Sequence, residues 1–113
     1  MTVNEKIVQA LSPFGLPITA DFFGGGENEY FTFNYASDRP EDFGDGKPLC
    51  VVTSVQIHYF LPIKKDYLSI KKQIRNAIFA AGFTYPEVTH LTEGKTTRHL
   101  IFECEIENDD ELM

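Results

Sequence analysis

The stretch Asp66-Tyr-Leu-Ser-Ile-Lys-Lys-Gln-Ile-Arg-Asn-Ala-Ile-Phe-Ala-Ala81, followed by Gly82, decides the fold predicted for this chain. Its apolar residues recur at intervals of three and four, as they do along one face of an α-helix; they are Tyr67, Ile70, Ile74, Ala77, Ile78 and Ala81. Asp66 is a suitable N-cap, and Gly82 stands where a left-handed residue commonly ends a helix. We therefore expect a helix over residues 66–81 that packs its apolar face on the rest of the domain.

Two strand-like segments follow this helix. Residues 84–92 contain Pro86, so this strand should begin irregularly, and Glu93-Gly94 then turns the chain into a second strand, Thr97–Glu107. Alternation along the second strand places Leu100, Phe102, Cys104 and Ile106 inward and His99, Glu103, Glu105 and Glu107 outward. Ile101 is the apolar exception on the outward side, and we interpret it as a contact residue. The tail, residues 108–113, is expected to fray.

The first half of the chain adds a helix and three strands. Thr2 and Glu5 form a capping-box pattern, and Val3, Ile7, Val8 and Leu11 then share one helical face. Residues 16–20 form a weak strand candidate because Pro17 restricts it to an edge or entry position. The Tyr30–Tyr35 segment alternates, with Phe31, Phe33 and Tyr35 on one face.

A long segment and a long strand come next. Residues 37–48 are rich in Asp, Gly and Pro, and we expect a long loop there that is either mobile or ordered by a partner. Residues 49–61 then predict the longest strand, with an apolar set toward the helices: Leu49, Val51, Val55, Ile57, Tyr59 and Leu61. The mixed opposite set faces either solvent or a neighbouring subunit: Cys50, Val52, Ser54, Gln56, His58 and Phe60.

The element order α-β-β-β-α-β-β predicts an α+β fold, a mostly antiparallel sheet with two helices packed on it. A chain of 113 residues with 42% hydrophobic residues suits a single domain over residues 1–113 with its own core. Cys50 and Cys104 fit no metal-binding spacing, and we expect both to be reduced. The chain shows neither a secretory signal nor an apolar run near the roughly 20 residues that span a bilayer.

The motifs give little support to catalysis. Glu93-Gly94-Lys95-Thr96 lacks the first glycine of a phosphate-binding loop, and Gly24-Gly25-Gly26 lacks the third glycine of a dinucleotide fingerprint. His58, His90 and His99 lie on different strands without close-spaced partners, so we interpret them as surface or internally satisfied residues. We expect no enzymatic activity, no metal and no cofactor. A net charge of -7 also disfavours general binding to phosphate backbones.

Three segments of the second half resemble tail terminator, or tail completion, proteins of siphophages and prophages. They are Asp66–Lys72, which opens the helix, Ala80–Phe83, which closes it, and the final strand His99–Ile106; the similarity spans roughly residues 51–107. The resemblance implies a structural α+β subunit that forms a homo-oligomeric ring, often a hexamer. That ring caps the tail tube, joins it to the head connector and lets DNA pass without specific binding.

Several expectations follow from the resemblance. The protein should occur in the bacterial cytoplasm during assembly and then in the virion, with no membrane partner. The candidate subunit contacts are the apolar residues on polar strand faces, Val52, Phe60 and Ile101, although Val52 and Phe60 fit equally well under the first helix. Another phage neck, tail or capsid accessory protein is the nearest alternative, and a cytoplasmic ligand-binding or regulatory module is the alternative from another class.

Overall fold

The computed structural model describes residues 1–44 and 46–108. Within them the chain forms α1 (Val3–Leu11), a short 3-10 helix η1 (Ser12–Phe14), β1 (Ile18–Ala20), β2 (Tyr30–Gly44), β3 (Lys47–Pro62), α2 (Leu68–Ala80), β4 (Glu87–Glu93) and β5 (Thr97–Glu107). This order confirms the predicted α+β fold.

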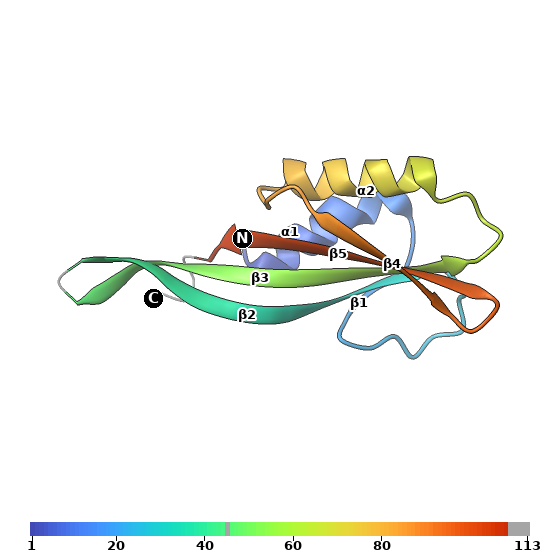
Figure 1. Ribbon diagram of the computed structural model, residues 1–113, viewed down its shortest axis with the longest axis horizontal. Coiled ribbons are helices and arrows are strands. Elements are labelled where there is room, and N and C mark those ends of the chain that lie inside the picture. The colour runs from blue at the N-terminus through green and yellow to red at the C-terminus, as the bar shows by residue number, and fades with distance from the viewer. Residues whose placement is uncertain (45, 109–113) are drawn as a thin grey trace.

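The five strands make one sheet in the order β1-β2-β3-β5-β4, and only the β1–β2 pair is parallel. Both helices lie on the same face of the sheet, and the β2–β3 hairpin projects well beyond them (Figure 1). The molecule is therefore elongated, with extents of 54 × 25 × 25 Å.

The core lies between this face of the sheet and the two helices. Its fully buried side chains come from every layer: Ile7 and Leu11 of α1, Ile74 and Ile78 of α2, Phe31 of β2, Ile57, Tyr59 and Leu61 of β3, and Leu100 and Phe102 of β5. The inward sets predicted for β3 and β5 are confirmed, except that the side chain of Leu49 lies outside the described set. Thr53 joins the inward set of β3 and is also fully buried.

The helix ends follow from local hydrogen bonds. In α1 the Thr2 hydroxyl accepts from the Glu5 amide at 3.1 Å and the Glu5 carboxylate accepts from the Thr2 amide at 3.2 Å, which confirms the capping box. α2 begins at Leu68 rather than Asp66, although the Asp66 carboxylate still accepts from the Leu68 amide at 3.1 Å. Gly82 follows the helix with a φ of 104°, a left-handed conformation that favours glycine.

The predicted loop over residues 37–48 is wrong, because β2 and β3 pair through most of it. The pairing runs from Tyr30 opposite Phe60 to Gly44 opposite Lys47, with a bulge between Tyr35 and Ser37. The bulge exchanges the two faces of β2, which hides the alternation from a sequence reading. Pro40 is tolerated because β2 has no second neighbour there among the described residues.

Three smaller expectations are corrected. Val8 is 43% exposed although it was placed on the buried face of α1. Tyr35 is equally exposed, because its hydroxyl donates to the Asn4 side chain at 2.6 Å instead of entering the core. Asn108, placed in the frayed tail, is buried, and its amide donates to the Val51 carbonyl at 2.7 Å. Residues 109–113 of that tail lie outside the described residues.

Replacing Leu100 by alanine should destabilise the protein by about 2–5 kcal/mol, because the deletion leaves a cavity in a fully buried site. Leu91→Ala is the matched control: Leu91 belongs to the neighbouring strand but is 43% exposed, so its loss should cost less than about 0.5 kcal/mol. Urea unfolding of both variants measures the difference, and equal costs would contradict the assigned core.

Candidate functional site

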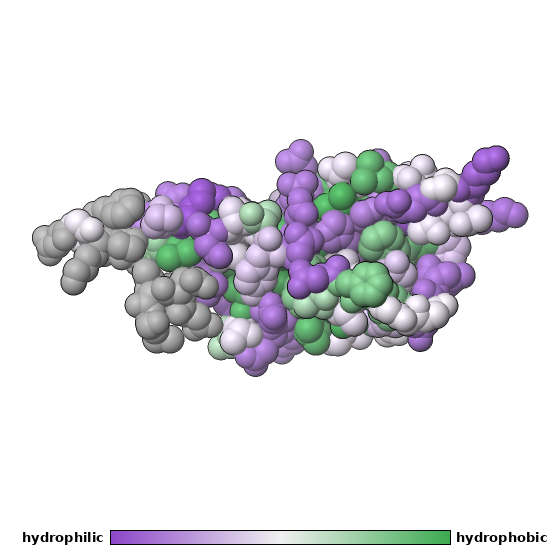
Figure 2. All heavy atoms as spheres, turned by 90° about the horizontal axis from the view of Figure 1, so that it is seen from below, coloured by the Kyte–Doolittle hydropathy of each residue, from purple (hydrophilic) through white to green (hydrophobic). Residues whose placement is uncertain are grey.

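The face of the sheet opposite the helices, here called the open face, is covered by no helix or strand of the described chain. Register places side chains of β2, β3, β5 and β4 on it in rows that cross the strands. Three of these rows are Tyr30–Phe60–His99–Leu91, Thr32–His58–Ile101–Thr89 and Asn34–Gln56–Glu103–Glu87. Viewed from the side opposite the helices, hydrophobic patches lie among hydrophilic side chains (Figure 2).

One half of the open face carries a continuous stack of rings, here called the aromatic row: Phe23, Tyr30, Phe60 and His99. Ring centroids are 4.3 Å apart for Phe23 and Tyr30, 4.8 Å for Tyr30 and Phe60, and 4.1 Å for Phe60 and His99, all nearly parallel. Stacking of this kind adds to the burial energy of each ring. The row ties the loop after β1 to β2, β3 and β5.

The aromatic row ends in a histidine pair that sequence reasoning missed, with His99 buried and His58 half-buried. His99 lies on the outward face of β5, as expected, yet it is only 7% exposed. His58 Nδ1 lies 2.8 Å from His99 Nε2, His58 Nε2 lies 2.7 Å from Asn34 Oδ1, and His99 Nδ1 lies 2.9 Å from Glu93 Oε1. His90 projects to the helix side of β4, so the structure brings two of the three histidines together.

The other half of the open face is acidic. Glu105 accepts from the Arg39 guanidinium at 2.6 Å and from the Ser54 hydroxyl at 3.0 Å, and these two bonds lower the pKa of Glu105 in that order. Arg39 also contacts Glu41 at 3.1 Å. Glu103 and Glu107 stand on the same face of β5, so carboxylates outnumber Arg39, the one arginine described on this half of the open face.

The structure places all three predicted contact residues on the open face, each half-buried. Val52 stands between Arg39 and Glu107, Phe60 between Tyr30 and His99, and Ile101 between His58 and Thr89. The residues that pack with α1 and α2 in the core belong to the opposite face of β3. Whether the three residues contact another subunit stays a prediction.

A second charged feature, here called the basic edge, lies where α2 meets the β4–β5 hairpin. The Arg98 guanidinium stacks 4.3 Å from the centre of the Tyr67 ring, and Lys71 lies 5.7 Å from that centre and 3.3 Å from His90 Nε2. Burial and then the nearby Lys71 and Arg98 charges lower the pKa of His90. Within the described residues neither Lys71 nor Arg98 forms an ion pair, and Arg98 Nε is buried without a hydrogen-bond partner.

A shallow groove borders the aromatic row beside the triple-glycine turn. It is lined by Asp21, Phe22, Phe23, Tyr30, Phe60 and Glu93, among others, and Phe22 is 79% exposed. The turn is anchored by Glu29, which accepts from the Tyr59 hydroxyl and pairs with Lys65 at 2.6 Å. Position 25 requires a glycine because the Phe23 ring packs directly against its backbone, and a Cβ there would lie 2.3 Å from that ring.

The other motifs noted in the sequence have structural roles in the fold. Gly94, with a φ of 64°, turns the chain between β4 and β5, as expected for a hairpin rather than a phosphate loop. Among residues 1–44 and 46–108, no group of three or more His, Cys, Asp or Glu side chains is arranged to hold a metal ion. In the same residues no helix is long and apolar enough to cross a membrane.

A scan of known protein families and a search of curated proteins found no match to this chain.

Gly25→Ala should disrupt the aromatic row, because the new methyl group needs the space of the Phe23 ring. The near-ultraviolet circular dichroism of the stacked rings should weaken, and the Tyr30 ring resonances should shift in NMR spectra. Gly26→Ala is the matched control, since nothing lies within 4 Å of a Cβ at that position. The assigned stack is wrong if both variants keep the wild-type spectra.

The two cysteines should differ sharply in reactivity. Burial, followed by the Glu105 charge, raises the pKa of Cys104 to about 12, so its thiol stays protonated and unreactive at lower pH. Cys50 is half-buried. Iodoacetamide at about pH 8 should label Cys50 at least about ten times faster than Cys104, as measured by peptide mass spectrometry. The difference should vanish in denaturant; equal rates in the folded protein would contradict the burial of Cys104.

Proposed function

We propose that this protein is a structural subunit of a phage or prophage tail, a tail terminator that assembles with copies of itself into a ring. In this role it caps the tail tube, joins it to the head connector and lets DNA pass through the ring without specific binding. The observation that carries the proposal is the uncovered face of the sheet, on which Val52, Phe60 and Ile101 stand among polar residues.

The sheet edges support assembly through unlike surfaces. β4 has no neighbour on its outer side among the described residues, and six of its seven residues are exposed. β1 covers β2 at Phe31–Phe33, and in the described part of the chain nothing pairs with the outer edge of β2 from Asn34 onward. The two edges differ, since the β2 edge carries a bulge and Pro40 whereas β4 carries neither. A contact between unlike surfaces repeats around a ring when its rotation closes.

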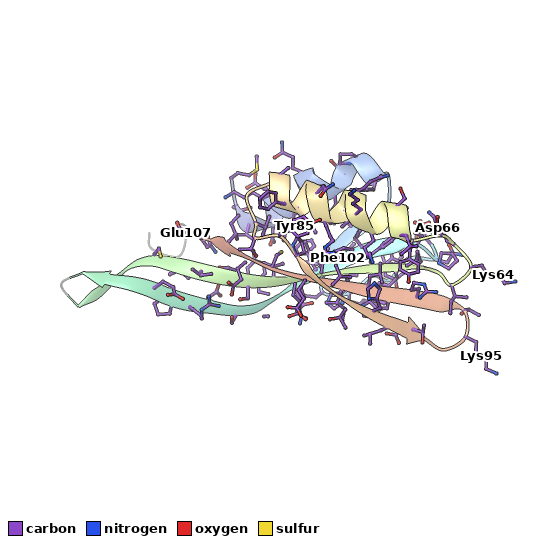
Figure 3. All side chains as sticks on the ribbon, turned by 45° about the horizontal axis from the view of Figure 1, so that its top comes forward. Lys64, Asp66, Tyr85, Lys95, Phe102 and Glu107 are labelled. Atoms are coloured by element: carbon purple, nitrogen blue, oxygen red, sulfur yellow. The ribbon has the colours of Figure 1, made fainter. Side chains whose placement is uncertain are left out.

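The charges favour the same head-to-tail arrangement. Lys64 and Lys95 project from one end of the molecule, and Glu107 lies toward the opposite end of β5 (Figure 3). The basic edge, whose Lys71 and Arg98 form no ion pair within the described residues, lies nearer the first end, and the Arg39, Glu41 and Glu105 cluster lies nearer the second. Placing the acidic half of one copy against the basic edge of the next would pair these charges and fix the orientation of the contact.

The charge of the chain also suits the proposed passage of DNA. Copies with a net charge of -7 keep carboxylates that the proposed contact does not pair, and an inner wall lined by such carboxylates repels phosphates and gives DNA nothing to hold. Native mass spectrometry should detect a closed oligomer of one copy number, alone or on tail tubes. A monomer under both conditions, or a positive potential along the hole of an observed ring, would contradict the proposal.

Another phage neck or tail component fits the same surfaces, whereas a ligand-binding module is favoured by one observation alone. That observation is the groove beside the triple-glycine turn, with its exposed Phe22 and the stacked Phe23. A gene position between head-completion genes and the major tail protein gene would distinguish the tail proteins from the ligand-binding module. A small molecule that protects the Phe22 ring from solvent in NMR spectra would favour the module.

Ile101→Asp should abolish the higher oligomers, because it places a charge in the centre of the proposed contact. Val8→Asp is the matched control, since Val8 is an exposed apolar residue on the helix side of the molecule. Size-exclusion chromatography with light scattering measures the masses, and far-ultraviolet circular dichroism verifies that both variants fold. An unchanged mass for a folded Ile101→Asp variant would exclude this residue from the contact.

A further inference from the structure

The hydrogen bonds of the histidine pair determine how many protons it holds. Asn34 Oδ1 and the Glu93 carboxylate only accept hydrogen bonds, so each requires an N–H from the ring nitrogen that faces it. The Asn34 amide nitrogen is occupied separately, as a donor to Gln56 Oε1 at 3.2 Å. The bond of 2.8 Å between the two rings requires a third N–H. Two neutral imidazoles carry only two N–H groups between them.

We propose that His58 and His99 share one extra proton, and that this proton locks the aromatic row on the open face. All three hydrogen bonds exist together only when the pair carries one positive charge. We call this hydrogen-bonded state the closed lock: it forms at intermediate pH and is lost, or opens, in both acid and alkali. The inference rests on the hydrogen bonds and the ring stack, and it does not depend on the proposed function.

The surroundings place the positive charge on His99. Its Nδ1–H donates to the Glu93 carboxylate at 2.9 Å, and this negative charge favours an imidazolium over a neutral ring. His58 faces the neutral Asn34 amide and has no such counter-ion. Burial, and then the positive charge of His99, lowers the pKa of His58. In the closed lock His99 is therefore an imidazolium, and His58 is neutral with its proton on Nε2.

The remaining ionisable groups near the pair are mostly acidic or uncharged. β4 contributes Glu93, β5 contributes Glu103 one row away, β2 contributes Tyr30 through the aromatic row, and the loop after β1 contributes Asp21 in the adjoining groove. The β4–β5 turn contributes Lys95, which projects away from the sheet (Figure 3). Both helices lie on the other face (Figure 1). A single positive charge on the pair is thus compensated locally.

Changing the number of protons breaks the ring-to-ring bond. A fourth proton puts an N–H on both facing nitrogens, so the rings repel at the observed distance. Removing the third proton leaves one bond without a donor. Phe60 stacks on His99 at 4.1 Å and lies 6.3 Å from His58, so either change removes the support beneath the aromatic row. Because the two rings share their protons, the acid step and the alkaline step are each titrations of the pair and not of one histidine alone.

The experiment is an NMR titration of the full chain with ¹⁵N-labelled histidine rings, from about pH 5 to about pH 9. Near neutral pH, His99 should show two protonated nitrogens, and His58 should show the neutral form with its proton on Nε2. The Tyr30 and Phe60 ring resonances should move at both the acid and the alkaline step. The proposal would be overturned by two neutral histidines near neutral pH, or by Tyr30 and Phe60 resonances that stay unchanged at both steps.

Variants separate the lock from a general change in stability. Glu93→Gln removes the counter-ion but keeps a side chain that hydrogen-bonds, so the midpoint of the alkaline step should fall by at least about one pH unit. His90→Gln is the matched control: it identifies the third histidine resonance and should leave both steps of the pair in place. A Glu93→Gln variant with an unchanged alkaline step would also overturn the proposal, because the counter-ion would then not hold the proton.

Discussion

The structure depends on β3, which pairs along its length with β2 on one side and with β5 on most of the other, and separates two different environments. Every second residue must fit a dry core under the helices, and each residue between them must fit a face that no described element covers. A shift of one residue would exchange Tyr59 and Ile57 with Phe60 and His58 and bury the polar set. The positions of the core, the aromatic row and the carboxylates all follow from this one register.

The grouping of the charged side chains is visible only in the folded structure. Along the sequence the cations of residues 64–75 and the carboxylates of residues 103–107 appear as separate solvated segments. In the fold, Arg39 and Lys65 are neutralised by carboxylates whereas Lys71 and Arg98 gather around Tyr67 without one in the described chain. Exposed ion pairs contribute little to stability. The uneven distribution therefore contributes little to the stability of the fold.

Sequence patterns predicted the elements whose apolar residues recur at a regular interval. They failed where that interval is interrupted. The α2 face, the inward residues of β5 and the capping box at Thr2 were predictable because each uses local spacing. The far part of the β2–β3 hairpin, within residues 37–48, was mistaken for a loop because a bulge after Tyr35 inverts the alternation and Pro40 suggests irregular chain. The histidine pair was missed because it depends on the pairing of β3 with β5, which places His99 beside Phe60, and sequence spacing contains no information on that register.

The proposed subunit contact and the proposed lock occupy neighbouring rows, which has a physical consequence for both. Ile101 stands opposite His58, and Phe60 stands opposite His99, so a partner that covers Ile101 also removes water from the pair. Burying an isolated charge opposes association strongly, whereas a charge that already has Glu93 as its counter-ion opposes it far less. Association should therefore favour the singly charged pair over the doubly charged one. By linkage, an acid pH that opens the lock by adding the second charge weakens the contact by the same free energy that the contact contributes to excluding that charge.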